Sequence, residues 1–299
     1  MWETALAFAI WGSYGSVLAA ARIDPALTAI ARSAGLGILL LAASAIVARV
    51  RGPREITAAI PWRSGALWLS GAVLLVDEVL YSVSAVSGPV AIIGLAYGCV
   101  PVLAPLLSRV AGTDRAGTMR ARHWICLALA FAGNAVVFVE LQAAQIHFTM
   151  AAVCAFFAGL LFTIMPVCSA KLQQGGLGTW AVLKGQGAIA AILSLPLLAL
   201  LIVGGVVARG DPGHTQLVRR SLEVGAFNAV VFTLTPFYLW YRGIARSGVA
   251  RTSICAFAEP LVATLFSLFV LRDAPFTPLL VGGVSLVLAA IAVAARADG

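Results

Sequence analysis

Long apolar runs, separated by short polar or glycine- and proline-rich links, dominate this chain of 299 residues. A helix that crosses about 30 Å of hydrocarbon needs about 20 apolar residues, and ten such runs fit the sequence. Backbone polar groups in lipid must bond within their own segment, so each run is predicted to be a helix. The composition agrees, because 61% of residues are apolar, 11% are charged and the mean hydropathy is +1.00. The sequence therefore predicts an all-α polytopic membrane protein.

Polar or helix-breaking clusters divide the chain into ten predicted transmembrane helices. They cover about residues 3–21, 25–48, 64–81, 88–108, 122–141, 147–169, 177–206, 223–241, 249–271 and 275–295. Because most links are short, successive helices are predicted to be antiparallel neighbours. The one longer link, about 207–222, has room for a short interfacial helix.

Lysine and arginine predict the orientation of these spans, because cytoplasmic links carry an excess of them. With the N-terminus in the cytoplasm, thirteen fall on the inner side and five on the outer side. The 207–222 link is the exception, with three arginines on the outer side. We therefore predict a multi-pass protein of the inner membrane with both termini in the cytoplasm. Met1-Trp2-Glu3 has no positive side chain, so no cleaved signal peptide is expected.

Several function classes do not fit this sequence. The net charge of +8 comes from arginines between apolar runs, which is typical of topology signals rather than nucleic-acid binding. The five cysteines lie in apolar segments without CxxC spacing, and the three histidines form no metal signature. No P-loop is present, so ATP is not the expected energy source. We expect no metal, no cofactor and no nucleic-acid partner.

An internal repeat predicts two halves of five helices each. Residues 81–88 and 241–248 both read Y-x-x-x-A-x-S-G, and each motif is predicted to join two spans tightly. Pro101 and Pro260 follow at about the same spacing, in the next span of each half. Only the second copy carries arginines, as expected if the two copies lie on opposite faces of the bilayer. The predicted halves, 1–143 and 144–299, are thus inverted repeats, and such repeats typically form transporters with a midplane site.

The chain resembles ten-helix, EamA-type members of the drug/metabolite transporter (DMT) superfamily. The resemblance rests on Trp11-Gly12-Ser13, Pro25, Arg32, Pro101, Pro260 and Gly282-Gly283. Within that superfamily it is most similar to YddG-type exporters of aromatic and other amino acids, on the basis of Glu78 late in the third span. Those exporters tend to have Tyr-x-x-Pro in the fourth span, whereas here Tyr97 stands four residues before Pro101, so an aromatic preference is left open.

Charged residues inside spans are the first candidates for a binding site, because each costs about 2.5–3.5 kcal/mol at a helix centre. Glu259 lies in the middle of the ninth span, directly before Pro260, where it would suit an ammonium group or a proton. Arg32 and Lys184 would attract a carboxylate. The alternatives are a glutamate hydrogen-bonded between helices, and cations that reach the interface or a helix C-terminus.

Two further groups complete the candidate substrate site. Asp77 and Glu78 are neighbours that point about 100° apart, so at most one is expected to face a central cavity. The resemblance to the YddG-type exporters implies that it is Glu78. Trp11 and Tyr14 share one helix face, and Tyr97 lies between two glycines. These rings would stack on a side chain or a cation. A hydrated outer rim for the acids and ordinary packing for the rings are the alternatives.

The leading prediction is a secondary transporter that exports amino acids, aromatic ones among them, or similar small metabolites by alternating access. Protons are the candidate coupling ion. The second prediction is a multidrug or other metabolite exporter on the same fold, with hydrophobic cations as substrates. A membrane-embedded, lipid-modifying enzyme would need a clustered nucleophile, acid and base or metal, which three scattered histidines do not provide. The chain is therefore predicted not to be an enzyme.

Overall fold

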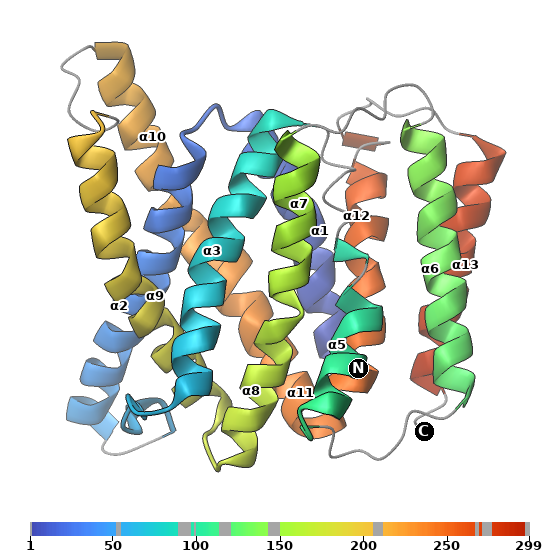
Figure 1. Cartoon of the computed structure of the whole chain (residues 1–299), viewed down its shortest axis with the longest axis horizontal. Helices are drawn as coiled ribbons and strands as arrows, with labels where there is room; N and C mark the ends of the chain where they lie inside the picture. The colour runs from blue at the N-terminus through green and yellow to red at the C-terminus, as the bar shows by residue number, and fades with distance from the viewer. Residues whose placement is uncertain are drawn as a thin grey trace.

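The computed structural model describes residues 2–51, 55–88, 97–98, 100–113, 121–142, 150–205, 212–266, 269–270 and 277–296. Over these residues the chain is nearly all helical and has no strand, which confirms the predicted all-α architecture. Five of the described helices are long and apolar enough to cross a membrane. The helices run side by side in one bundle (Figure 1).

The first half contributes α1 (Trp2–Ala20), α2 (Pro25–Arg51), the 3-10 turn η1 (Glu55–Thr57), α3 (Gly65–Ser87), α5 (Val100–Val110) and α6 (Ala121–Gln142). The second half contributes α7 (Met150–Phe162), α8 (Ile164–Gln174), α9 (Thr179–Val203), α10 (Pro212–Asn228), the π-helical η2 (Ala229–Leu234), α11 (Thr235–Ile254), the 3-10 turn η3 (Cys255–Phe257), α12 (Ala258–Phe266) and α13 (Pro278–Arg296). The predicted fourth span, 88–108, is described at 97–98 and from residue 100 onward.

Prolines break two predicted spans into shorter helices. The sixth span divides into α7 and α8 at Thr163, because Pro166 has no N–H to donate to the carbonyl of Phe162. In the eighth span, Pro236 likewise lacks the N–H of a regular helix, and the π-helical segment η2 stands directly before it, between α10 and α11. Each break leaves a carbonyl, that of Phe162 or Phe232, without its regular helical donor.

The prediction that the two Y-x-x-x-A-x-S-G motifs are interhelical links was wrong. The first motif is the last two turns of α3, which ends only at Ser87 with Gly88 as its cap. The second lies within α11, and the backbone leaves helical geometry only at Gly248, with φ 80° and ψ 166°. Alanine, serine and valine continue the helix, whereas glycine alone tolerates the positive φ. Both motifs therefore end at a glycine break.

Helices of the two halves pack against each other through the bundle. α2 packs on α9, α6 on α13, and α1 on both α11 and α12. The first two pairs cross at glycines: a Cβ on Gly37 would lie 2.3 Å from the carbonyl oxygen of Gly187, and one on Gly133 would lie 2.7 Å from that of Gly283. The predicted boundary at residues 143 and 144 lies outside the described residues and stays a prediction.

Candidate functional site

A small hollow of about 10 Å³, about the space that one water molecule needs, lies in the middle of the bundle, and we call it the central cavity. Helices of both halves line it. Its lining residues are Trp11, Tyr14, Arg32, Asp77, Glu78, Tyr81, Tyr97, Phe162, Phe237 and Glu259. Six of the seven substrate-binding residues predicted from the sequence are among them, and only Lys184 is not.

Asp77 corrects one sequence prediction, because it lines the central cavity together with Glu78. The cavity extends around α3, so two neighbouring side chains that point about 100° apart both reach it. Glu78 turns toward Arg32 on α2. Asp77 turns toward Tyr97, whose hydroxyl donates a hydrogen bond to Oδ1 at 2.5 Å.

Arg32 is the cation of the central cavity and is almost fully engaged. Its Nη1 donates to Oε2 of Glu78 in a buried ion pair, and its Nε donates to Oγ1 of Thr233. Its Nη2 donates to the carbonyl oxygen of Phe232 at 2.7 Å, and the guanidinium carbon lies 4.1 Å from the centre of the Tyr14 ring. Arg32 therefore ties α2, α3, α1 and η2 together.

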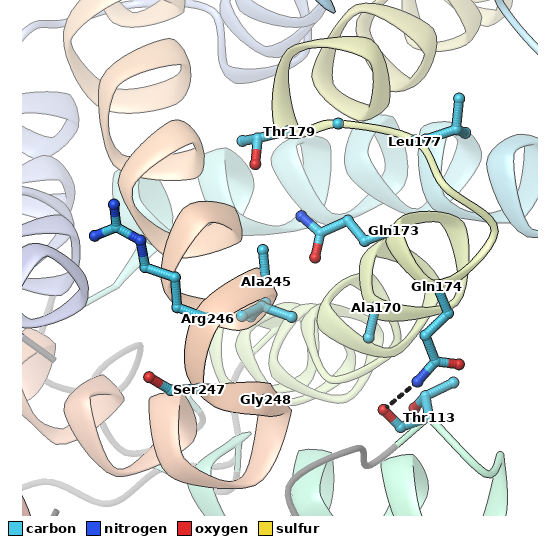
Figure 2. A pocket seen from close by; sticks show the side chains of 12 residues that line it. Thr113, Ala170, Gln173, Gln174, Leu177, Thr179, Ala245, Arg246, Ser247 and Gly248 are labelled. Carbon is cyan, nitrogen blue, oxygen red and sulfur yellow. Dashed lines mark hydrogen bonds between the residues drawn. The ribbon is translucent and has the colours of Figure 1, made fainter.

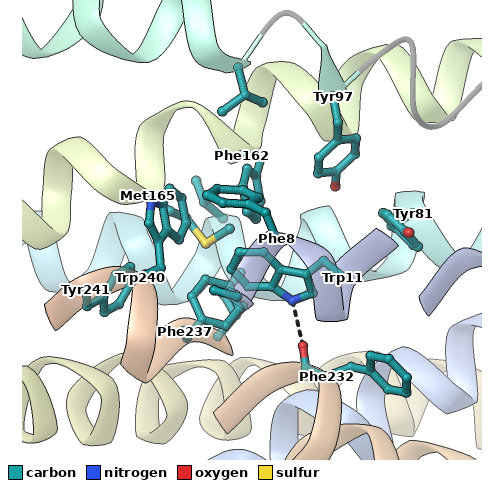
Figure 3. Packing of buried hydrophobic residues seen from close by; sticks show 14 of the residues in the cluster. Phe8, Trp11, Tyr81, Tyr97, Phe162, Met165, Phe232, Phe237, Trp240 and Tyr241 are labelled. Atoms are coloured by element: carbon teal, nitrogen blue, oxygen red, sulfur yellow. Dashed lines mark hydrogen bonds between the residues drawn. The ribbon is translucent and has the colours of Figure 1, made fainter. Parts of the chain in front are cut away.

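The carbonyl of Phe232 is available to Arg32 because of Pro236. In a regular helix the amide of residue 236 would donate to the carbonyl of residue 232, and proline has no such N–H. The freed oxygen instead accepts from Arg32 and from Nε1 of Trp11, also at 2.7 Å (Figure 3). The Thr235-Pro236 pair inside an apolar run was the sequence signal for this acceptor, and the sequence analysis missed it.

Glu259 is buried, with 4% of its surface exposed, and lines the central cavity from α12. Within the described residues its carboxyl has no hydrogen-bond or ion-pair partner. The crossing of α1 and α12 fixes its backbone, since a Cβ on Gly12 would lie 2.5 Å from the Glu259 carbonyl oxygen. The next residue, Pro260, is buried, as is Pro101 in α5. Glu259 is thus an unpaired acid at a rigid crossing.

An aromatic layer closes one end of the central cavity (Figure 3). The rings of Phe162 and Trp240 stack with centroids 4.9 Å apart, and Trp11 meets Phe237 edge to face at 4.9 Å. Phe8 packs edge to face on both tryptophans. Along α1 and α11 these rings lie between the cavity and the end of the bundle where Glu3 pairs with Arg242 and Arg246.

A second, wider hollow of about 1090 Å³, which includes open solvent, lies at that end, and we call it the vestibule (Figure 2). It is lined by residues of α8, the start of α9 and the last turn of α11 before Gly248. The side-chain amide of Gln173 donates to the carbonyl of Tyr241 at 3.0 Å, and that of Gln174 donates to the carbonyl of Thr113 at 2.8 Å. In the predicted orientation the vestibule faces the cytoplasm.

Lys184 lies away from the central cavity and holds the link between α2 and α3. Its Nζ donates to the carbonyl oxygens of Ile56 at 2.7 Å and Ala58 at 2.5 Å, and to Oγ of Ser44 at 3.3 Å. These acceptors occupy the three donors of the ammonium group. The placement agrees with the alternative reading of Lys184 as a structural cation.

We expect Lys184→Met to destabilise the fold by about 1–3 kcal/mol, because it leaves two carbonyl acceptors of a partly buried link without their charged donor. Unfolding in detergent, titrated with dodecyl sulfate, would measure the loss. Lys171→Met is the matched control, since Lys171 is exposed on α8. Equal stability of the two variants would contradict the anchoring role.

Comparisons with known proteins agree with the fold. Residues 149–296 match the EamA-like transporter family. A solved structure titled only "Crystal structure of protein" is 20% identical, over 98% of this chain and 96% of that chain, with a TM-score of 0.71. At that identity the likeness shows the fold alone. No curated protein matches the chain.

The second part of the chain therefore carries an EamA-like transporter domain, and the polytopic membrane fold predicted from the sequence is confirmed. The match points to a membrane transporter of the drug/metabolite type, which has a small-molecule substrate and lies in a lipid bilayer. A transporter family is also consistent with a protein that is not an enzyme.

Proposed function

We propose that this chain is a secondary transporter of the inner membrane, with cytoplasmic termini, that exports amino acids or similar small metabolites bearing an ammonium group. The observation that carries the proposal is Glu259, a buried carboxyl without a partner among the described residues, in an aromatic-lined cavity between the two predicted halves. Once desolvated, an ammonium group needs such an acid, and the unpaired acid needs a cation. Alternating access moves the solute across, with protons as the candidate coupling ion.

Arg32 supports amino acids as the leading class of substrate. A guanidinium has five N–H donors, and Thr233, Glu78 and Phe232 accept from three of them. One N–H on each Nη atom is left for a solute carboxylate. A zwitterion would then be bound by Arg32 at its carboxylate and by Glu259 at its ammonium group.

Hydrophobic cations form the second candidate class. Their support is the acid surplus of the described lining, where Arg32 is the single cation and is already paired with Glu78. Six aromatic rings in the same lining offer faces to an organic cation. Such a solute would use Glu259 and the rings without any contact to Arg32.

Counterflow into proteoliposomes with three matched solutes tests the proposal. Phenylalanine has both charged groups, phenethylamine lacks the carboxylate, and hydrocinnamate lacks the ammonium group. We expect phenylalanine to exchange and hydrocinnamate to fail, because only the ammonium group pairs with Glu259. Exchange of phenethylamine alone would favour the hydrophobic-cation class.

Two outcomes of the same experiment would overturn the proposal. Exchange of hydrocinnamate at the rate of phenylalanine would show that the ammonium group is not recognised. Failure of all three solutes, and of the aliphatic amines and amino acids tested below, would remove the assignment to ammonium-bearing substrates.

A further inference from the structure

The central cavity holds one more acid than a single ammonium group can neutralise. Its described lining contains three carboxyls, those of Asp77, Glu78 and Glu259, and one cation, Arg32. Glu78 forms the ion pair with Arg32, which leaves that pair neutral. Asp77 and Glu259 remain without a cationic partner among the described residues.

The hydrogen bond from Tyr97 does not neutralise Asp77. A phenol donates a hydrogen bond to the carboxyl without bringing a positive charge, so Asp77 stays without a cationic partner in a site that is largely shielded from water. An isolated carboxylate in such a site is costly unless a cation or a proton joins it. Asp77, like Glu259, therefore needs a cation or a proton, and it lies on another wall of the cavity.

The rest of the lining is suited to organic cations. The rings of Trp11, Tyr81 and Phe237, among others, line the cavity, and aromatic faces attract positively charged nitrogen groups. The buried side chain of Tyr14 also lines the cavity, and its ring already lies against the guanidinium of Arg32. Within the same part of the chain, no group of three or more His, Cys, Asp or Glu is arranged to hold a metal ion.

We propose that the central cavity is a two-point cation site, whose solute carries two ammonium groups, one paired with Glu259 and the other with Asp77. This inference rests on the proposed function and narrows its substrate class. Short diamines and basic amino acids share this chemistry. A basic amino acid would also place its carboxylate on the two free N–H groups of Arg32.

Four solutes, matched in pairs by carbon chain, separate the effect of the second ammonium group from that of the carboxylate. Lysine and cadaverine carry two ammonium groups, whereas norleucine and pentylamine carry one. Lysine and norleucine also carry the carboxylate that the other two lack. In proteoliposome counterflow with the intact protein, we expect each solute with two ammonium groups to exchange at least tenfold better than its partner with one. Whichever of lysine and cadaverine exchanges faster shows whether the solute class is basic amino acids or short diamines.

Asp77→Asn assigns the second point of contact. We expect it to reduce the preference for cadaverine over pentylamine at least tenfold, because the second ammonium group loses its acid. Glu223→Gln, on the exposed surface of α10, is the control for a lost acid and should retain the preference. If Asp77→Asn does not fold, the four-solute comparison on the unmodified protein decides alone.

The outcomes distinguish this inference from the function on which it rests. Equal exchange of cadaverine and pentylamine, and of lysine and norleucine, would overturn the two-point site and leave transport of ammonium-bearing solutes intact. An unchanged preference in a folded Asp77→Asn variant would overturn the role of Asp77. If none of the four solutes exchanges, and phenylalanine and phenethylamine also fail, the proposed function itself is lost.

Discussion

Glu259→Gln is expected to reduce solute exchange at least about a hundredfold while leaving the stability of the protein equal or higher. Removal of one charge from a desolvated ion pair costs about 3 kcal/mol or more, which corresponds to that factor in affinity. The free protein loses nothing by the change, because the carboxyl has no protein partner among the described residues and is costly to bury. Counterflow of the fastest-exchanging solute and thermal unfolding in detergent give the two readouts.

The matched control is Glu223→Gln, which removes an exposed carboxyl paired with Arg219. Such a surface pair contributes about 0–1 kcal/mol, so neither transport nor stability should change measurably. Exchange by Glu259→Gln at the rate of the unmodified protein would rule out Glu259 as the partner of the ammonium group. A large loss of stability would instead indicate a structural role for Glu259.

Much of the helical framework could be predicted from the sequence, because the membrane leaves few alternatives. Long apolar runs must form helices, and a charge within a run must face the bundle interior or a cavity. These two constraints led to the helical fold and to Arg32 and Glu259, whereas Glu78 was chosen over Asp77 from the family resemblance. They operate on single residues and short segments, so one sequence is sufficient for them.

The residues that were missed depend on partners far away in the sequence. Asp77 and Glu78 both reach the cavity because α2 and the Tyr97 segment lie on different sides of α3, and helical periodicity alone cannot reveal this. Lys184 finds its acceptors in the link after α2, more than a hundred residues earlier in the chain. Such contacts follow from how the helices pack, and the local sequence around each residue does not predict them.

The acceptor at Phe232 is a different case, since the sequence contained its cause. A proline inside an apolar run frees the carbonyl four residues before it, and Pro236 therefore predicts an open acceptor at residue 232. The identity of its donors, Trp11 and Arg32, still required the packing of α1 and α2 against η2. The backbone chemistry was local, whereas the pairing was not.

Glu78→Gln, in contrast to Glu259→Gln, is expected to destabilise the fold by about 3–5 kcal/mol. The change removes the carboxylate that is hydrogen-bonded to the guanidinium of Arg32, and breaking a buried pair from one side costs about that much. Glutamine can still accept a hydrogen bond from Nη1 of Arg32, so the loss of stability measures the missing negative charge rather than a missing hydrogen bond. Arg32→Met should cost a similar amount, because it leaves the carboxylate of Glu78 unpaired.

A double-mutant cycle separates the ion pair from the packing around it. The double variant Arg32→Met with Glu78→Gln leaves neither member of this pair without the other, so we expect it to recover at least about 2 kcal/mol relative to the sum of the single losses. Its remaining loss would come from Thr233 and Phe232, whose oxygen atoms lose Arg32 as a donor, although Trp11 still donates to Phe232. Dodecyl sulfate titration of all four proteins measures the cycle. Strictly additive losses would mean that the two residues stabilise the bundle independently, and the buried pair would then not be what holds α2 against α3.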